Sequence, residues 1–150
     1  MELDEFDRRL LTALQQDARR TGEQLAAIVG LSPAACLRRA QRLRETGIIE
    51  REIAVVAPKA VGRRLMMLVT VVLEGEQTAD EFKRQVRRAP EVLECYHVTG
   101  PTDYILVTAT ADMEEYQEFT KRVLIGNVKR FESTLVIDRV KFETTQPIAE

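Results

Sequence analysis

Five arginines lie between residues 36 and 51, against two glutamates: Arg38, Arg39, Arg42, Arg44 and Arg51. A guanidinium group binds phosphate oxygens and can also donate two hydrogen bonds to guanine, as glutamine can to adenine. Gln41 follows Arg38 by three positions, a spacing that places both side chains on one face of a helix. These residue types favour contact with DNA. On charge alone, a solvated helix face remains an equally good explanation.

The positive charge is local. Residues 1–64 carry 12 lysines and arginines and 9 acidic residues, a net charge of +3, whereas residues 65–150 carry 10 and 15, a net charge of −5. The whole chain has a net charge of −2. A basic patch on an otherwise acidic chain is typical of a confined DNA contact and not of a protein that coats nucleic acid.

The arginine-rich stretch is predicted to form a helix from Ser32-Pro33 to about Thr46, closed by Gly47. Serine is a good cap, and proline is tolerated at the first helical position because no amide donor is needed there. Residues about 100° apart place one apolar stripe inward, comprising Cys36, Ala40 and Leu43. The opposite stripe faces outward and consists of Ala34, Arg38, Gln41 and Glu45, flanked by Ala35 and Arg42.

This outward stripe can enter a DNA groove. Arg38 suits guanine and Gln41 suits adenine, while the small Ala34 and Ala35 let the helix approach the groove floor. Arg39 and Arg42 lie at the sides, where phosphates would be. For Arg39, an ion pair with an acidic residue of its own domain is an equal alternative.

Two further helices are expected to position this one. The first follows Asp4, a helix cap, and carries Leu10, Leu11 and Leu14 at helical spacing. The second opens with the capping-box pattern of residues 21–24 and ends at Gly30. A tight turn, residues 30–33, joins the second and third helices, which is the pattern of a helix-turn-helix. Residues 48–56 are strand-like, which predicts a winged-helix-like domain.

The second half of the chain has a different periodicity. Strands are expected at residues 66–73, 92–99, 104–110 and 128–142. Helices are expected after a capping box at residues 78–81, with Phe82 and Val86 inward, and after an Asp112 cap, with Tyr116, Phe119 and Val123 inward. The order strand, helix, strand, strand, helix, strand is the ferredoxin-like βαββαβ arrangement, so the fold class is α+β.

Both faces of the first strand are apolar. Met67, Val69, Val71 and Leu73 alternate with Met66, Leu68, Thr70 and Val72. In this topology both helices cover one sheet face, so the other face needs a second cover. Self-association is the economical solution. Cover by the N-terminal domain is the alternative.

The residues that would indicate catalysis or a metal are few. His97, the one histidine, lies inside a strand, where a packed or surface imidazole is the ordinary outcome. Cys36 and Cys95 are far apart and are expected to be buried apolar residues of a reducing compartment. No nucleophile context, phosphate loop or metal cluster is evident, so no cofactor and no enzymatic activity are expected.

Two separate stretches resemble the Lrp/AsnC (feast/famine) family of regulators. In the first half the resemblance lies in Leu3-Asp4, Asp7-Arg8-Arg9-Leu10-Leu11, Val29-Gly30-Leu31-Ser32-Pro33 and Gly47-Ile48-Ile49. In the second half it lies in Val98-Thr99-Gly100, Asp103-Tyr104, Leu106-Val107 and Val136, Val140-Lys141. Two unrelated motifs at the family's separation, over nearly the full chain, make this resemblance specific.

The resemblance implies a regulator that binds double-stranded DNA and responds to an amino acid or related metabolite. It also implies a homodimer, often assembled further to an octamer. Ser32 to Arg42 fall on the family's recognition helix, and Gly100, Thr102 and Asp103 fall in a loop of its effector site between subunits. The chain departs from the family at Thr102, where an aromatic residue is frequent. Asp103 is the best acceptor for an effector ammonium group, although it can instead bond its own turn.

The expected organisation is a DNA-binding domain at residues 1–56, a linker at 57–65 and a sensing and oligomerisation domain at 66–150. The acidic start of the chain is not that of a signal peptide and no apolar run has the length of a membrane span, which favours the cytoplasm. Two other functions compete with regulation. One is an enzyme on the same scaffold, similar to the siroheme decarboxylases, and the other is a ligand-binding module without DNA binding.

Overall fold

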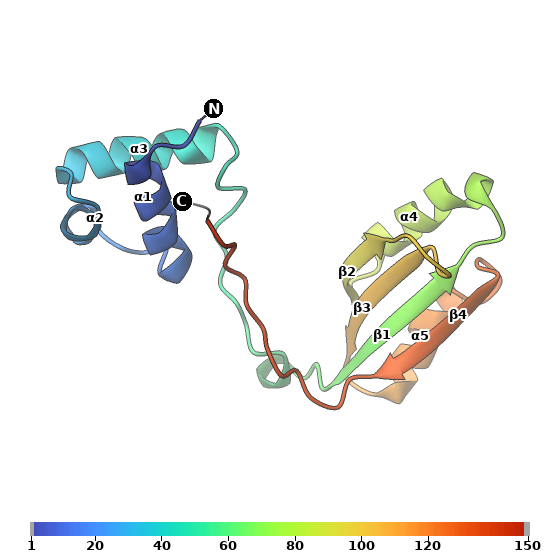
Figure 1. Ribbon diagram of the computed structural model, residues 1–150. Helices are drawn as coiled ribbons and strands as arrows, with labels where there is room; N and C mark the ends of the chain where they lie inside the picture. Colours follow the sequence, from blue (N-terminus) through green and yellow to red (C-terminus); the bar gives the residue numbers. More distant parts are fainter. Residues whose placement is uncertain (1, 149–150) are drawn as a thin grey trace. The chain divides into compact units, whose positions relative to one another are not determined.

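The computed structural model describes residues 2–148 and divides them into two compact units (Figure 1). The first unit, which we call the helical unit, comprises the described residues up to Ala54 together with those from Lys141 onward. The second, the sheet unit, comprises Val55–Val140. Each unit has its own hydrophobic core.

The helical unit contains α1 (Glu5–Gln16), α2 (Gly22–Val29) and α3 (Pro33–Glu45). Its core consists of one face of each helix: Leu10, Leu11, Ala13, Leu14, Leu25, Val29, Cys36, Ala40 and Leu43. The inward stripe that helical spacing predicts for α3 is therefore confirmed, and three short helices pack as the helix-turn-helix pattern requires.

The predicted helix ends of this unit are confirmed. Asp4 and Asp7 form a reciprocal capping box at α1, as Thr21 and Gln24 do at α2. At the end of α2, Gly30 has φ of +81°, a left-handed conformation that side chains other than glycine rarely adopt. This glycine lets the chain turn sharply from α2 into α3.

The predicted strand at residues 48–56 is wrong. The chain there has no regular structure, and Ile53 and Val55 are exposed. A strand needs a hydrogen-bonding partner, and in the described part of the chain no other strand runs along this segment. The helical unit consequently has no wing built from these residues.

The C-terminal segment belongs to the helical unit, and not to the 66–150 domain expected from the sequence. The Gln15 side chain pairs with the Gln146 backbone, donating to its carbonyl at 3.1 Å and accepting from its amide at 2.5 Å. Ile148 packs against the helical core. The chain therefore leaves the helical unit near Ala54 and returns to it at Lys141.

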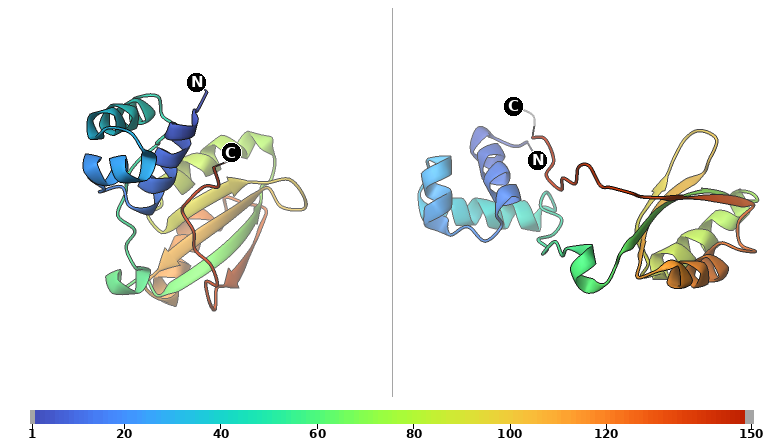
Figure 2. Two further views of the ribbon diagram at one scale, coloured as in Figure 1. Left: turned by 60° about the vertical axis from the view of Figure 1, so that its left-hand side comes forward. Right: turned by 90° about the horizontal axis from the view of Figure 1, so that it is seen from below.

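The sheet unit confirms the ferredoxin-like prediction. After a 3₁₀ turn (Pro58–Val61), its elements are β1 (Leu65–Val72), a 3₁₀ turn (Glu76–Thr78), α4 (Ala79–Arg88), β2 (Val92–His97), β3 (Tyr104–Thr110), α5 (Met113–Val123) and β4 (Arg130–Leu135). The sheet order is β2-β3-β1-β4, with antiparallel neighbours throughout. Both helices cover the same face of the sheet (Figure 2).

Alternation in β1 and β3 separates two sheet faces. Val69 and Val71 of β1 and Leu106 of β3 are buried beneath the helices with Phe82 and Phe119. The residues between them point to the other side, which we call the open face: Met66, Leu68, Thr70 and Val72 of β1, and Ile105 and Val107 of β3. The open face is largely apolar, as the sequence predicts, and Leu68 is 41% exposed.

Three local predictions in this unit need correction. Strand β4 ends at Leu135 and not near residue 142, because its partner β1 begins at Leu65; the last backbone bond between them runs from the Val136 amide to the Met66 carbonyl at 2.9 Å. The Thr78 side chain does not cap α4 and bonds the Gly75 carbonyl instead. Cys95, expected to be buried, is exposed on the edge strand β2. The Asp112 cap of α5 is confirmed.

Candidate DNA interface and effector loop

Helix α3 begins as its sequence predicts. The Ser32 hydroxyl accepts a hydrogen bond from the Ala35 amide at 3.3 Å, and Pro33 occupies the first turn. At the other end, the Thr46 hydroxyl donates to the Arg42 carbonyl at 2.8 Å. The helix is thus closed at both ends, which fixes the direction of the side chains between them.

The outward face of α3 carries the residues proposed for base contacts. Ala34, Arg38 and Gln41 are exposed. The Gln41 amide donates to the Glu45 carboxylate at 2.9 Å, so it would have to leave this partner to reach a base. Arg38 makes no ion pair with any residue that the structure describes.

A shallow open groove of about 380 Å³ lies along this face, lined by Leu31, Ala35, Arg38, Arg39 and Arg42. Its lining combines two apolar side chains, Leu31 and Ala35, with three guanidinium groups. Such a surface suits an anionic ligand that is flat enough to lie against its apolar part.

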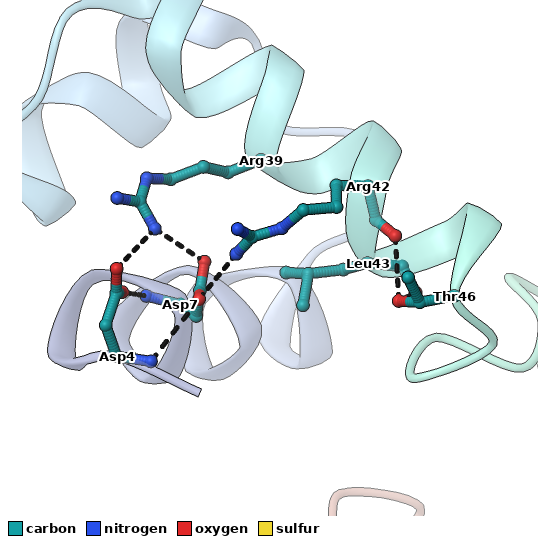
Figure 3. Close-up of polar contacts among 6 residues, drawn as sticks. All are labelled: Asp4, Asp7, Arg39, Arg42, Leu43 and Thr46. Carbon is teal, nitrogen blue, oxygen red and sulfur yellow. Dashed lines mark hydrogen bonds and ion pairs between the residues drawn. The ribbon is translucent and has the colours of Figure 1, made fainter. Parts of the chain in front are cut away.

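Two of these arginines are held by carboxylates at the start of α1 (Figure 3). Arg39 Nη1 lies 2.7 Å from Asp4 Oδ2 and 2.8 Å from Asp7 Oδ1. Arg42 Nη2 lies 2.6 Å from Asp7 Oδ2. Asp7 is only 1% exposed, so its charge depends on these two partners. Of the two possibilities for Arg39, the structure shows the ion pair within its own domain.

Asp4 and Arg39 each stabilise the ionised form of the other. The Asp7 backbone amide, followed by the Arg39 guanidinium, lowers the pKa of Asp4 below its usual value. The hydrogen bond that Arg39 donates to Asp4, followed by the one it donates to Asp7, raises the pKa of Arg39. Both groups therefore stay ionised at neutral pH. Arg39 also lies over the ring of Phe6, 5.6 Å from its centre.

The burial of Asp7 was not among the features expected from the sequence. The signal for its burial was present, because Asp7, Leu11 and Leu14 follow the spacing i, i+4, i+7 and so share the inward stripe of α1. An acidic residue on an apolar stripe requires a cationic partner. Its partners, Arg39 and Arg42, lie more than 30 positions away along the chain.

The segment after α3 contains Glu50 and Glu52, and Glu52 has a partner within the helical unit. Glu52 accepts from Arg44 at 2.7 Å. The segment therefore offsets one more arginine of α3.

The three predicted effector residues lie together in the β2–β3 loop of the sheet unit. Asp103 Oδ2 accepts from the Leu73 amide at 2.8 Å, and the Thr102 hydroxyl donates to the Val71 carbonyl at 2.7 Å. The Asp103 side chain therefore bonds the residue that follows β1, whereas its backbone carbonyl accepts from the Val98 amide within its own loop at 3.0 Å. Gly100 has φ of +118°, a conformation that favours glycine.

Two other side chains of the sheet unit, His97 and Cys95, are of types that can take part in catalysis. The imidazole of His97 stacks on the ring of Tyr104, with centres 4.8 Å apart. Partial burial raises the pKa of the Cys95 thiol, which makes it less reactive. Across residues 2–148, no three His, Cys, Asp or Glu side chains gather as metal ligands would. No described helix has the length and apolar character needed to cross a membrane.

Comparison with known protein families assigns both halves of the chain. A model of the AsnC-type helix-turn-helix domain matches residues 3–44, and a model of the Lrp/AsnC ligand binding domain matches residues 65–146. The chain belongs to the Lrp/AsnC family. It is a transcription regulator with an N-terminal DNA-binding domain and a C-terminal ligand-binding domain.

Individual relatives agree. The chain is 49% identical to the HTH-type transcriptional regulator y4tD of Sinorhizobium fredii, over 99% of this chain and 90% of that protein. It is 31% identical to the DNA-binding transcriptional activator DecR of Escherichia coli, over 97% and 99% of the two chains. Among solved structures, the regulator NMB0573 of Neisseria meningitidis, in complex with L-Met, superposes with a TM-score of 0.92 at 33% identity, covering 97% of each chain.

The ion pairs predict a difference in stability between neighbouring arginines. Arg39→Ala should lower the free energy of unfolding by about 1–3 kcal/mol, because it leaves the buried Asp7 with one partner instead of two. Arg38→Ala, the matched control, should change it by less than about 0.5 kcal/mol, because Arg38 is exposed and unpaired among the described residues. Urea unfolding followed by circular dichroism measures both. Equal stability of the two variants would contradict a structural role for Arg39.

Proposed function

We propose that α3 lies in the major groove of its DNA site and reads bases through Arg38 and Gln41. The observation that carries this proposal is the exposed stripe of α3, on which Arg38 has no ion pair in the described part of the chain. A guanidinium without a partner can donate two hydrogen bonds to a guanine edge.

The other predicted residues shape the same surface. Ala34 and Ala35 are small enough to let the helix backbone approach the groove floor. Ser32 and Pro33 place the positive end of α3 toward the DNA backbone. Arg39 and Arg42 line the groove in the protein surface. In the proposed complex they lie beside the DNA phosphates.

Alanine substitutions test this interface. Arg38→Ala and Gln41→Ala should each weaken binding to the specific site by about 1–3 kcal/mol and relax the preference for one base. The control, Arg19→Ala, removes an equal charge from the exposed loop after α1 and should leave the base preference unchanged. Binding is measured by fluorescence anisotropy on a duplex selected by the protein from a random pool. If Arg38→Ala binds that duplex as tightly as the parent, the reading stripe is on another face.

For the C-terminal domain we propose an amino acid as effector, held at the loop of Gly100, Thr102 and Asp103. The Neisseria meningitidis relative was solved with L-Met, which supports this class of ligand. Asp103 uses Oδ2 to bond the Leu73 amide. Its other oxygen remains as an acceptor for an ammonium group, since no described residue donates a hydrogen bond to it.

The effector proposal requires a variant that keeps the loop intact. Asp103→Asn retains an oxygen for the Leu73 amide but loses the charge, so it should preserve the melting temperature and weaken amino-acid binding by about 1.5–3 kcal/mol. A thermal-shift screen of the twenty amino acids first identifies the ligand, and calorimetry then compares the variants. Asp80→Asn, on the exposed side of α4, serves as the control. Unchanged affinity in Asp103→Asn would place the ammonium site elsewhere.

We also propose that the protein is a homodimer formed through the open face, as in its family, with assembly to an octamer. The open face carries a contiguous apolar surface over β1 and β3 that neither α4 nor α5 covers. Two copies related by a twofold axis can bury this surface against itself. An effector bound near the subunit boundary would then shift the balance between assemblies and change how many α3 helices reach the DNA together.

A charge on the open face should break the dimer. Leu68 is 41% exposed, so Leu68→Glu loses only about 0.6–1.2 kcal/mol of apolar burial in each copy and in addition buries a carboxylate; the dimer dissociation constant should rise roughly tenfold or more. Met113→Glu places the same carboxylate at an exposed position on α5 and should leave the assembly unchanged. Sedimentation equilibrium of the full chain distinguishes these results. A Leu68→Glu variant that remains dimeric would show that the contact lies on another surface.

The proposed role is regulation without catalysis, carried out in the cytoplasm where the DNA is accessible. The described residues near the effector loop bond one another through backbone groups, which suits a binding site better than a reactive one.

A further inference from the structure

We propose that Asp7, together with Asp4, is a specificity-determining residue that offsets the charge of Arg39 and Arg42 and so limits attraction to DNA of any sequence. This inference rests on the DNA contact proposed for α3. It concerns how strongly that contact depends on phosphate charge and how strongly on bases.

The arginines of α3 are largely neutralised by the protein itself. Arg39 is paired with Asp4 and Asp7, Arg42 with Asp7, and Arg44 with Glu52. With Glu45, which also lies on α3, four carboxylates balance the charge of the four arginines of this helix. The basic patch that the sequence suggests is therefore close to neutral, and Arg38 is the arginine of α3 left without an ion pair among the described residues.

Unlike a dissolved counterion, the Asp7 carboxylate cannot leave the arginines when DNA binds. Its two oxygens are each occupied by one guanidinium, and Oδ2 also accepts from the Asp4 amide at 3.3 Å. Its side chain is 1% exposed, and its position is fixed by the first turn of α1. Salt screens such partly buried pairs less than pairs in which both groups are at the surface. The Asp7 carboxylate therefore stays bound to Arg39 and Arg42, where it supplies the negative charge that a DNA phosphate would otherwise supply.

This arrangement has a measurable consequence. Proteins gain affinity for DNA from the counterions that phosphates release, and the logarithm of affinity falls with that of salt concentration by about 0.9 per phosphate neutralised. An arginine whose charge is already offset contributes little to this slope. Binding to random DNA is thereby weakened, while hydrogen bonds from Arg38 and Gln41 to bases are retained, which raises the ratio of specific to non-specific affinity.

The test is Asp7→Asn in the full chain. The amide has the same shape and keeps one acceptor oxygen, but the cluster gains one positive charge. We expect the salt slope on a random-sequence 30-base-pair duplex to become steeper by about 0.9, which amounts to about 3.5-fold between 50 and 200 mM salt. Affinity for that duplex should rise severalfold at low salt, and the preference for the selected duplex should fall by a similar factor.

Two further variants separate charge from folding. Asp4→Asn removes the exposed partner of Arg39, is not expected to disturb the core, and should shift the slope in the same direction. Glu5→Gln adds the same charge beside Arg9 on α1, away from the groove, and should leave slope and preference unchanged.

The outcomes are distinct. If Asp7→Asn and Asp4→Asn bind both duplexes with the slope of the parent, or lose affinity for both, the carboxylates are structural only and the inference is overturned. An equal steepening in Glu5→Gln overturns it as well, because net charge alone would explain the result. If the parent protein prefers no duplex over random DNA, it is the proposed function that fails.

Discussion

The buried carboxylate of Asp7 is the constraint on which the DNA-binding half depends. A charge that is 1% exposed is tolerated only with partners, and both partners come from α3, the helix proposed to read DNA. The same two ion pairs join the first turn of α1 to the middle of α3. They therefore fix α3 against α1 and offset the positive charge of Arg39 and Arg42, which line the proposed DNA interface.

The sheet unit follows a different constraint, namely that a sheet with helices on one side must find cover for an apolar second side. Val69 and Val71 are buried with α4 and α5, while Leu68, which points to the other face, remains 41% exposed. The loop between β2 and β3 is held to β1 by Asp103 and Thr102. A ligand at this loop would act directly on the strand that carries the open face, which offers a short physical route from effector to assembly.

Much of the fold could be predicted because it is encoded locally. Helix caps such as Ser32 and Asp112 act within four residues, and the alternation of β1 is set by the pleat of the strand itself. Predictions failed where the outcome depended on a distant partner. Residues 48–56 have strand-forming side chains but no strand beside them, and β4 ends close to the residue at which its antiparallel partner β1 begins.

For the candidate sites, the sequence by itself determined which side chains α3 turns outward and which residues share the β2–β3 loop, because helical and strand periodicity are local properties. Only the tertiary structure decided that Arg39 and Arg42 are neutralised by Asp7, that the chain end returns to α1 at Gln146, and that Asp103 bonds Leu73. Each of these contacts joins residues at least 30 positions apart, and periodicity carries no information on which surfaces meet when the chain folds.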